Sequence, residues 1–161
     1  MVSVKRVAWI LILLSTLFTP IFAKPAPTFT LPIDKGGSIC LDSLRGKVVY
    51  LDFWASWCDP CRKSFPWMET LQKKFGEKGF KVVAVSLDKK REAADDFLEK
   101  HPGSFIVAFD PTGTTAQKYE IKAMPSSFLI DRDGNIVSTH QGFREADTDS
   151  LQAHIEEIVG K

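Results

Sequence analysis

Residues 47–63 read KVVYLDFWASWCDPCRK, an apolar run that leads directly to two cysteines separated by two residues. The apolar run over residues 47–53 is typical of a β-strand that is covered on both faces. Asp59-Pro60 then indicates the start of a helix, because proline suits the first helical turn. The stretch therefore predicts a buried strand that brings Cys58 and Cys61 to the N-terminus of a helix.

The rest of the chain alternates strand patterns with helix patterns. We expect a hairpin over residues 28–41, helices over 59–75, 90–100, 112–119 and 147–159, and strands over 80–87, 105–109, 127–130 and 135–139. This order of elements predicts an α/β sandwich. With 161 residues, of which 44% are hydrophobic, the chain suits one globular domain.

The N-terminal segment has the pattern of an export signal. Lys5 and Arg6 precede an apolar run over residues 7–18, and a small residue follows at position 23. Either residues 1–23 are a signal peptide, or residues 7–23 stay as an anchor in the inner membrane. In both cases we expect the protein to be periplasmic or otherwise extracytoplasmic. The chain then divides into residues 1–23, a short stiff spacer over residues 24–27 and a domain over residues 28–161.

The charge of the chain argues against a nucleic-acid partner. The formal net charge is +1, and it becomes −1 when the two cations of residues 1–23 are removed. A protein that binds nucleic acid needs a basic surface to meet the phosphates, and the sequence has no basic block.

The cysteine pair has several interpretations. A structural disulfide between Cys58 and Cys61 would close too short a loop to restrict the unfolded chain much. A zinc site would need two more ligands, and the three histidines are scattered singly, so we expect no metal. Arg62 stands where a haem-attachment motif needs histidine. Redox exchange is the interpretation that the context favours, with no cofactor beyond the pair itself.

The position of the pair gives a physical reason for such chemistry. Unpaired N–H groups and the helix dipole at a helix N-terminus stabilise an anion, which lowers the pKa of the Cys58 thiol. Cys61, one turn further in, can then attack the mixed disulfide. Pro60 presets the first helical turn, whereas the negative charge of Asp59 partly opposes the dipole.

Residues 52–61, DFWASWCDPC, resemble the active site of the thioredoxin superfamily, and Met124-Pro125 stands where that family has a cis-proline. The N-terminal hairpin, the Leu-Arg-Gly-Lys sequence at residues 44–47 and the added strand and helix between residues 80 and 100 resemble the exported TlpA/ResA-like branch. The resemblance covers residues 28–161. It implies a thioredoxin-like fold, with a central mixed sheet flanked by helices, a hairpin extension and an inserted strand-helix unit.

The resemblance also suggests roles for single residues. Asp52 would be a buried acid that exchanges a proton with Cys61, and burial should raise its pKa. Trp57 and the backbone of Met124, before a cis Pro125, would contact the substrate. Asp88 is either an acid near the active site or a cap for the helix that follows.

Two further residues leave alternatives open. Cys40 is either a small buried residue or free thiol, or a third redox cysteine. Trp54 is expected in the core or at its rim.

We therefore expect a monomeric thiol-disulfide oxidoreductase that reduces protein disulfides. A membrane electron donor would reduce its cysteine pair again after each turnover. The apocytochromes of cytochrome c maturation are one candidate group of clients. Asp59 favours a reductant, because a less stable thiolate accompanies a more stable disulfide. Two alternatives are a copper- or metal-handling thioredoxin-like module and a docking domain whose disulfide is only structural.

Overall fold

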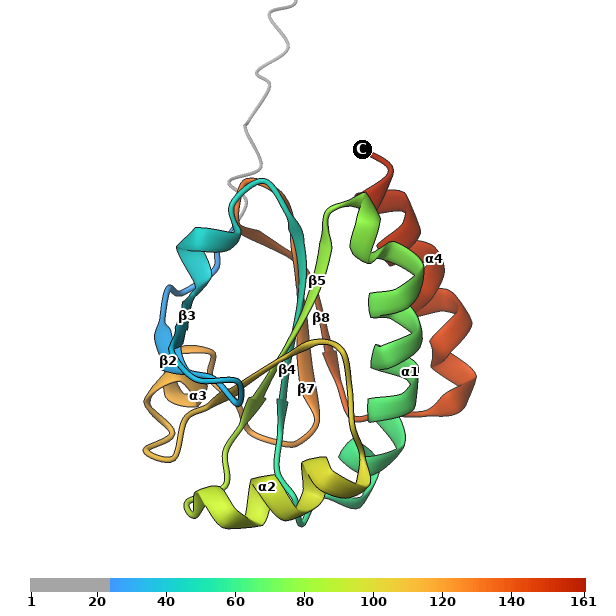
Figure 1. Cartoon of the computed structure of the whole chain (residues 1–161). Helices are drawn as coiled ribbons and strands as arrows, with labels where there is room; N and C mark the ends of the chain where they lie inside the picture. The colour runs from blue at the N-terminus through green and yellow to red at the C-terminus, as the bar shows by residue number, and fades with distance from the viewer. Residues whose placement is uncertain (1–23) are drawn as a thin grey trace, which may run out of the picture.

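The computed structural model describes residues 24–161 (Figure 1). The signal peptide or anchor expected over residues 1–23 lies outside the described residues. Within the described part, no helix is both long and apolar enough to cross a membrane. In chain order the elements are β1 (Lys24–Pro25), β2 (Thr30–Pro32), β3 (Ser38–Cys40), η1 (Leu41–Leu44), β4 (Val48–Trp54), α1 (Asp59–Phe75), η2 (Gly76–Lys78), β5 (Phe80–Ser86), α2 (Arg91–Lys100), β6 (Ile106–Phe109), α3 (Thr114–Lys118), β7 (Ser126–Ile130), β8 (Asn135–Gln141), η3 (Glu145–Asp147) and α4 (Thr148–Val159).

The main sheet has six strands in the order β1-β8-β7-β4-β5-β6. Strand β4 pairs in parallel with β5 and antiparallel with β7, so the sheet is mixed, as the resemblance implied. All seven residues of β4 are buried, which explains why its sequence is apolar at every position except Asp52 and does not alternate. The prediction that this strand is covered on both faces is confirmed.

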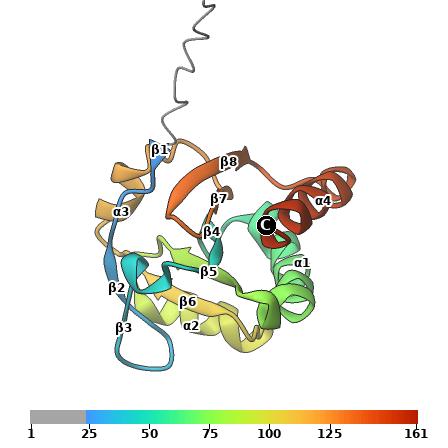
Figure 2. The ribbon, with the colours of Figure 1, turned by 90° about the horizontal axis from the view of Figure 1, so that it is seen from above.

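The two faces of the sheet carry different layers (Figure 2). Helices α1 and α4 lie on one side of the sheet, whereas β2, β3 and α3 lie on the other. Because side chains alternate along a strand, Val48, Tyr50 and Trp54 belong to the core under α1, and Val49 belongs to the core under α3. Asp52 shares the even-numbered register and therefore points toward the α1 side.

Helix α1 is held by one apolar stripe. Phe65, Met68, Leu71 and Phe75 recur at helical spacing and are all almost completely buried against the sheet. Burying one side chain of this size stabilises a fold by about 1.5–3 kcal/mol, so the stripe anchors α1 and with it the cysteine pair.

Residues 24–27, expected as a spacer, are part of the folded body. Lys24 and Pro25 pair with Ile136 and Asn135 of β8, and the Pro27 carbonyl accepts a hydrogen bond of 2.8 Å from the Tyr119 hydroxyl. The Lys-Pro-Ala-Pro composition suggested a stiff extended segment, and an extended segment can also add a strand to the edge of a sheet.

Candidate active site

The cysteine pair lies at the junction of β4 and α1. Cys58 is the N-cap residue of α1, and its Sγ accepts a hydrogen bond of 3.3 Å from the Cys61 N–H. The two residues form a disulfide with their Cα atoms 5.3 Å apart. Pro60 occupies the first helical turn, where its missing N–H costs nothing. The predicted position of the pair at a helix N-terminus is confirmed.

The chain turns from strand to helix through local hydrogen bonds. The Cys58 N–H donates to the Ala55 carbonyl at 3.0 Å, and the Arg62 N–H donates to the Cys58 carbonyl at 3.3 Å. Cys58 is 5% exposed and Cys61 is fully buried. The two sulfurs therefore differ in access, and solvent or a partner reaches the Cys58 side first.

Asp88 accepts hydrogen bonds from the loop that precedes Cys58. Its carboxylate accepts hydrogen bonds from the Ser56 N–H at 2.9 Å, the Ser56 hydroxyl at 2.7 Å and the Ser86 hydroxyl at 3.0 Å. Lys90 is the N-cap residue of α2, and among the described residues no side chain caps that helix. The Asp88 side chain therefore bonds to the cysteine loop and does not cap α2. Hydrogen bonds to an ionised carboxylate are among the stronger ones in proteins. The acid is thus a structural tie between the end of β5 and the active-site loop.

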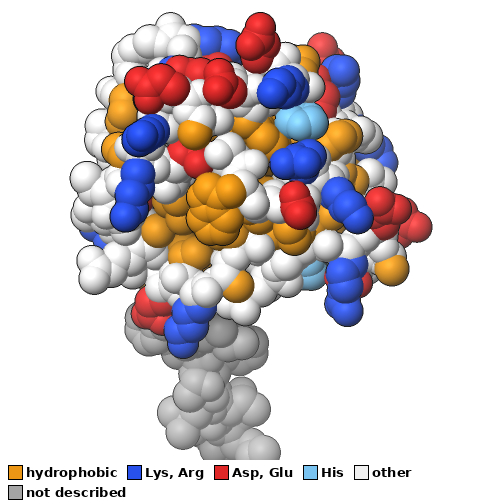
Figure 3. All heavy atoms as spheres, turned by 90° about the horizontal axis from the view of Figure 1, so that it is seen from below, with side chains coloured by type: hydrophobic (Ala, Val, Ile, Leu, Met, Phe, Trp, Pro, Cys, Tyr) orange, Lys and Arg blue, Asp and Glu red, His pale blue; other side chains and the backbone are white. Residues whose placement is uncertain are grey.

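The accessible side of the pair faces a shallow apolar groove. Trp57 is 70% exposed, and among the described residues the only other exposed large apolar side chain is Val137, at 38%. Figure 3 shows hydrophobic side chains gathered near the centre of this end of the molecule, with charges of both signs around them. The groove has a volume of about 480 Å³ and is lined by Trp57, Cys58, Asp59, Pro60, Lys122, Ala123 and Met124.

The far wall of the groove is the turn that enters β7. The Met124–Pro125 peptide bond is cis, as expected. The Pro125 carbonyl accepts a hydrogen bond of 2.8 Å from the Gly142 N–H, and the Ser126 hydroxyl donates to the Ala123 carbonyl at 2.7 Å. These bonds hold Met124 beside Cys58. The structure thus brings together the distant segments 57–60 and 122–124.

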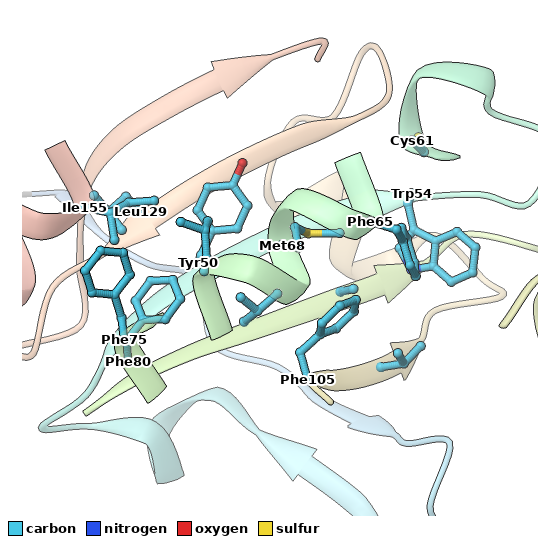
Figure 4. Close-up of a cluster of buried hydrophobic side chains, with 14 of the residues drawn as sticks. Tyr50, Trp54, Cys61, Phe65, Met68, Phe75, Phe80, Phe105, Leu129 and Ile155 are labelled. Carbon is cyan, nitrogen blue, oxygen red and sulfur yellow. The ribbon is translucent and has the colours of Figure 1, made fainter. Parts of the chain in front are cut away.

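The inner side of the pair is apolar. Figure 4 shows Cys61 at the same end of the buried cluster as Trp54 and Phe65, with Phe75 and Phe80 at the other end. Trp54 is fully buried and packs on Phe65 with ring centroids 4.8 Å apart, so it is a core residue. A Cys61 thiol in this setting is shielded from bulk water by its burial.

Asp52 is the acid on this face of the sheet. It is 2% exposed, and its Oδ2 has no hydrogen-bond partner within residues 24–161. Burial raises the pKa of this carboxyl well above its ordinary value, in the direction that the sequence predicted. A buried carboxylate with a raised pKa is a stronger base than an exposed one, so it can take up a proton during a reaction.

The remaining candidates lie further out. The Asp59 side chain is exposed, and the Arg62 guanidinium lies 3.6 Å from it. Cys40 is the free cysteine of the described chain and belongs to β3, in the separate two-stranded sheet. His140 and His154, which look scattered in sequence, line the same small cavity under α4. Over residues 24–161, no group of three or more His, Cys, Asp or Glu side chains is arranged to hold a metal ion.

Known proteins share both the sequence and the fold. The Redoxin family model matches residues 23–155. Thiol-disulfide oxidoreductase ResA is 35% identical over 136 residues in Bacillus thuringiensis subsp. konkukian, which covers 84% of this chain and 78% of that protein. ResA of Bacillus subtilis is 33% identical over 135 residues, covering 79% and 75% of the two chains.

One solved structure has a higher sequence identity to this chain than the two ResA proteins have. A Chlorobium tepidum protein assigned as thiol:disulfide interchange protein DsbE superposes with a TM-score of 0.83 and 51% identity, over 85% of this chain and 96% of that one. The chain belongs to the Redoxin family and, within the thioredoxin superfamily, to the ResA/TlpA-like branch of thiol-disulfide oxidoreductases.

Proposed function

We propose that the protein acts outside the cytoplasm as a reductant of protein disulfides, with Cys58 as the attacking sulfur and Cys61 as the resolving one. The observation that carries this proposal is the hydrogen bond from the Cys61 N–H to the Cys58 sulfur at the N-terminus of α1. The same N–H, together with the helix dipole, would stabilise a Cys58 thiolate.

The reaction has two exchange steps. The Cys58 thiolate attacks one sulfur of a client disulfide, and the other client sulfur leaves as a thiolate that takes up a proton. The Cys61 sulfur then attacks Cys58, giving up its proton to Asp52, and the second client sulfur leaves. The client gains two electrons and two protons, and Cys58–Cys61 becomes a disulfide.

The groove supports a protein client in an extended conformation. Trp57 offers an exposed aromatic surface on one side of Cys58, and the backbone before Pro125 lies on the other side. A segment lying between them would place its disulfide against the one sulfur that is accessible. The apocytochromes of cytochrome c maturation are candidate clients of this kind.

Asp59 supports the proposed direction of electron flow, from the cysteine pair to the client. Its exposed carboxylate follows Cys58 directly and disfavours a thiolate there, which favours the disulfide and a low reduction potential. Each turnover leaves the pair oxidised, so a reductant outside the cytoplasm needs a donor. We propose a membrane protein that delivers electrons to the Cys58–Cys61 disulfide.

The test uses a pair of variants. Cys61→Ser leaves Cys58 able to attack but removes the resolving sulfur, so mixed disulfides with clients should accumulate and be identified by mass spectrometry in the native host. Cys58→Ser is the matched control, since it keeps the buried Cys61 and the free Cys40. Adducts that form equally in both variants, or in neither, would contradict the exchange mechanism. Equilibration with glutathione tests the direction, and a potential near about −120 mV would contradict a reductant.

A further inference from the structure

Three polar residues lie in one row across the sheet. The antiparallel register places Asp52 of β4 opposite Ser127 of β7, and Ser127 opposite His140 of β8. Side chains of directly opposed residues project from the same face of a sheet, here the face under α1 and α4. With adjacent strands about 4.8 Å apart, the row covers about 10 Å from Asp52 to His140.

Both ends of the row carry an unsatisfied buried atom. Among residues 24–161, three buried side-chain nitrogen or oxygen atoms lack a hydrogen-bond partner, and two of them are Asp52 Oδ2 and His140 Nε2. Unpaired buried polar atoms are rare and call for a water molecule or a functional reason. Their shared row gives them a common explanation.

A small cavity with a mixed lining lies beside the row. Its volume of about 10 Å³ is about the smallest that can hold one water molecule. Its polar side chains are Tyr50, Ser127, Ser138, His140 and His154, and its apolar ones are Leu129, Leu151 and Ile155. Figure 4 shows the Tyr50 hydroxyl pointing away from Phe75 and Phe80. The hydroxyl and imidazole groups of this lining are the partners with which a water here would form hydrogen bonds.

The row runs from the interior to the surface. Asp52 is buried, whereas the His140 side chain is 24% exposed and its Nε2 lies 3.7 Å from Asp147 Oδ2. Asp147 also accepts a hydrogen bond of 2.8 Å from Arg144 Nε. The titratable and charged groups around the outer end are therefore Tyr50 from β4, His154 from α4, and Asp147 with Arg144 from the segment before α4.

We propose that Ser127, one water in the cavity and His140 form a proton path between Asp52 and solvent. The inference rests on the proposed role of Asp52 in resolution. When Cys61 forms its bond with Cys58, its proton passes to the Asp52 carboxylate and the electron pair of the broken bond leaves with the client sulfur. Asp52 then returns to its starting state by passing a proton along the Ser127 hydroxyl and the water to His140 Nε2. His140 releases the proton at the surface, and no electrons move along the path.

The experiment measures the resolving step directly. The reduced full-length protein is mixed with excess oxidised glutathione, and the limiting first-order rate of internal disulfide formation is followed by tryptophan fluorescence. We expect Ser127→Ala and His140→Gln each to slow this rate about tenfold or more, because proton transfer by a positioned group commonly contributes at least that much. Thr139→Ala, on the other face of β8, is the matched control and should leave the rate unchanged.

A double variant separates a proton path from a structural effect. In Asp52→Asn the path has no inner end, so adding Ser127→Ala should slow resolution no further, whereas unrelated structural effects would add. Unfolding curves for each variant show that the fold is retained. If Asp52→Asn slows resolution but Ser127→Ala and His140→Gln do not, the path is wrong and the role of Asp52 stands. If Asp52→Asn itself has no effect, both the path and that part of the proposed function are wrong.

Discussion

The buried carboxyl of Asp52 makes the stability of the protein depend on pH in a predictable direction. Burial raises its pKa in the folded state, whereas in the unfolded chain it titrates near the ordinary value of about 3.9. Between these two pKa values the folded state holds a proton that the unfolded state has released. The free energy of unfolding then falls by about 1.4 kcal/mol for each pH unit, until the pH passes the folded-state pKa.

Asp52→Asn removes this dependence, since asparagine does not titrate. We expect the variant to gain stability relative to the wild type by about 1.4 kcal/mol per unit as the pH rises above about 4, and the gain to level off at the folded-state pKa. All other titrating groups cancel in the difference. Urea unfolding of both oxidised proteins at pH 5, 6, 7 and 8 gives the difference directly.

The control for this experiment is Thr139→Ala, because Thr139 is exposed and the substitution removes no titratable group. Its difference from the wild type should stay flat over the same range. A flat difference for Asp52→Asn as well would refute the reasoning, because it would mean that the carboxyl titrates alike in the folded and unfolded chains.

Three further substitutions test the surroundings of the pair. Trp57→Ala should slow reduction of a protein disulfide several-fold and change the free energy of unfolding by less than about 0.5 kcal/mol, since the side chain is exposed; turnover of insulin and urea unfolding measure the two effects. Asp88→Ala leaves the Ser56 N–H and Ser86 hydroxyl without their acceptor, so urea unfolding should show a loss of about 2 kcal/mol or more. Asp59→Asn should lower the pKa of the Cys58 thiol and raise the reduction potential, which equilibration with glutathione measures; an unchanged potential would remove the electrostatic reason for a reductant.

The sequence predicted the elements that carry the cysteine pair because their signals are local. A near-continuous apolar run implies a strand covered on both faces, and Asp59-Pro60 implies a helix start. Both are found. The burial of Asp52 also followed from its position inside that run. Trp54 is buried and Trp57 is exposed, because β4 ends at Trp54 and Trp57 lies in the loop that follows. Sequence patterns locate the end of a strand only to within a few residues.

Other parts of the site could not be read from the sequence because they depend on pairing over long distances. The hydrogen bond between Ser56 and Asp88 joins residues 32 positions apart, and the sequence left open whether Asp88 lies near the active site or caps the next helix. The row through Ser127 and His140 depends on strand register, and a shift of one residue would turn those side chains to the other face. Residues 24–25 form a strand only because the edge of β8 is available to pair with them.

The measurement that tests the central claim most directly is the pH dependence of Cys58 alkylation in the reduced protein. Iodoacetamide reacts with thiolates, and peptide mass spectrometry reads Cys58, Cys61 and Cys40 separately. We predict that Cys58 reacts with an inflection clearly below the ordinary thiol value of about 8.5, while the buried Cys61 stays protected. A Cys58 that titrates like a free thiol, or that reacts no faster than Cys61, would contradict the account.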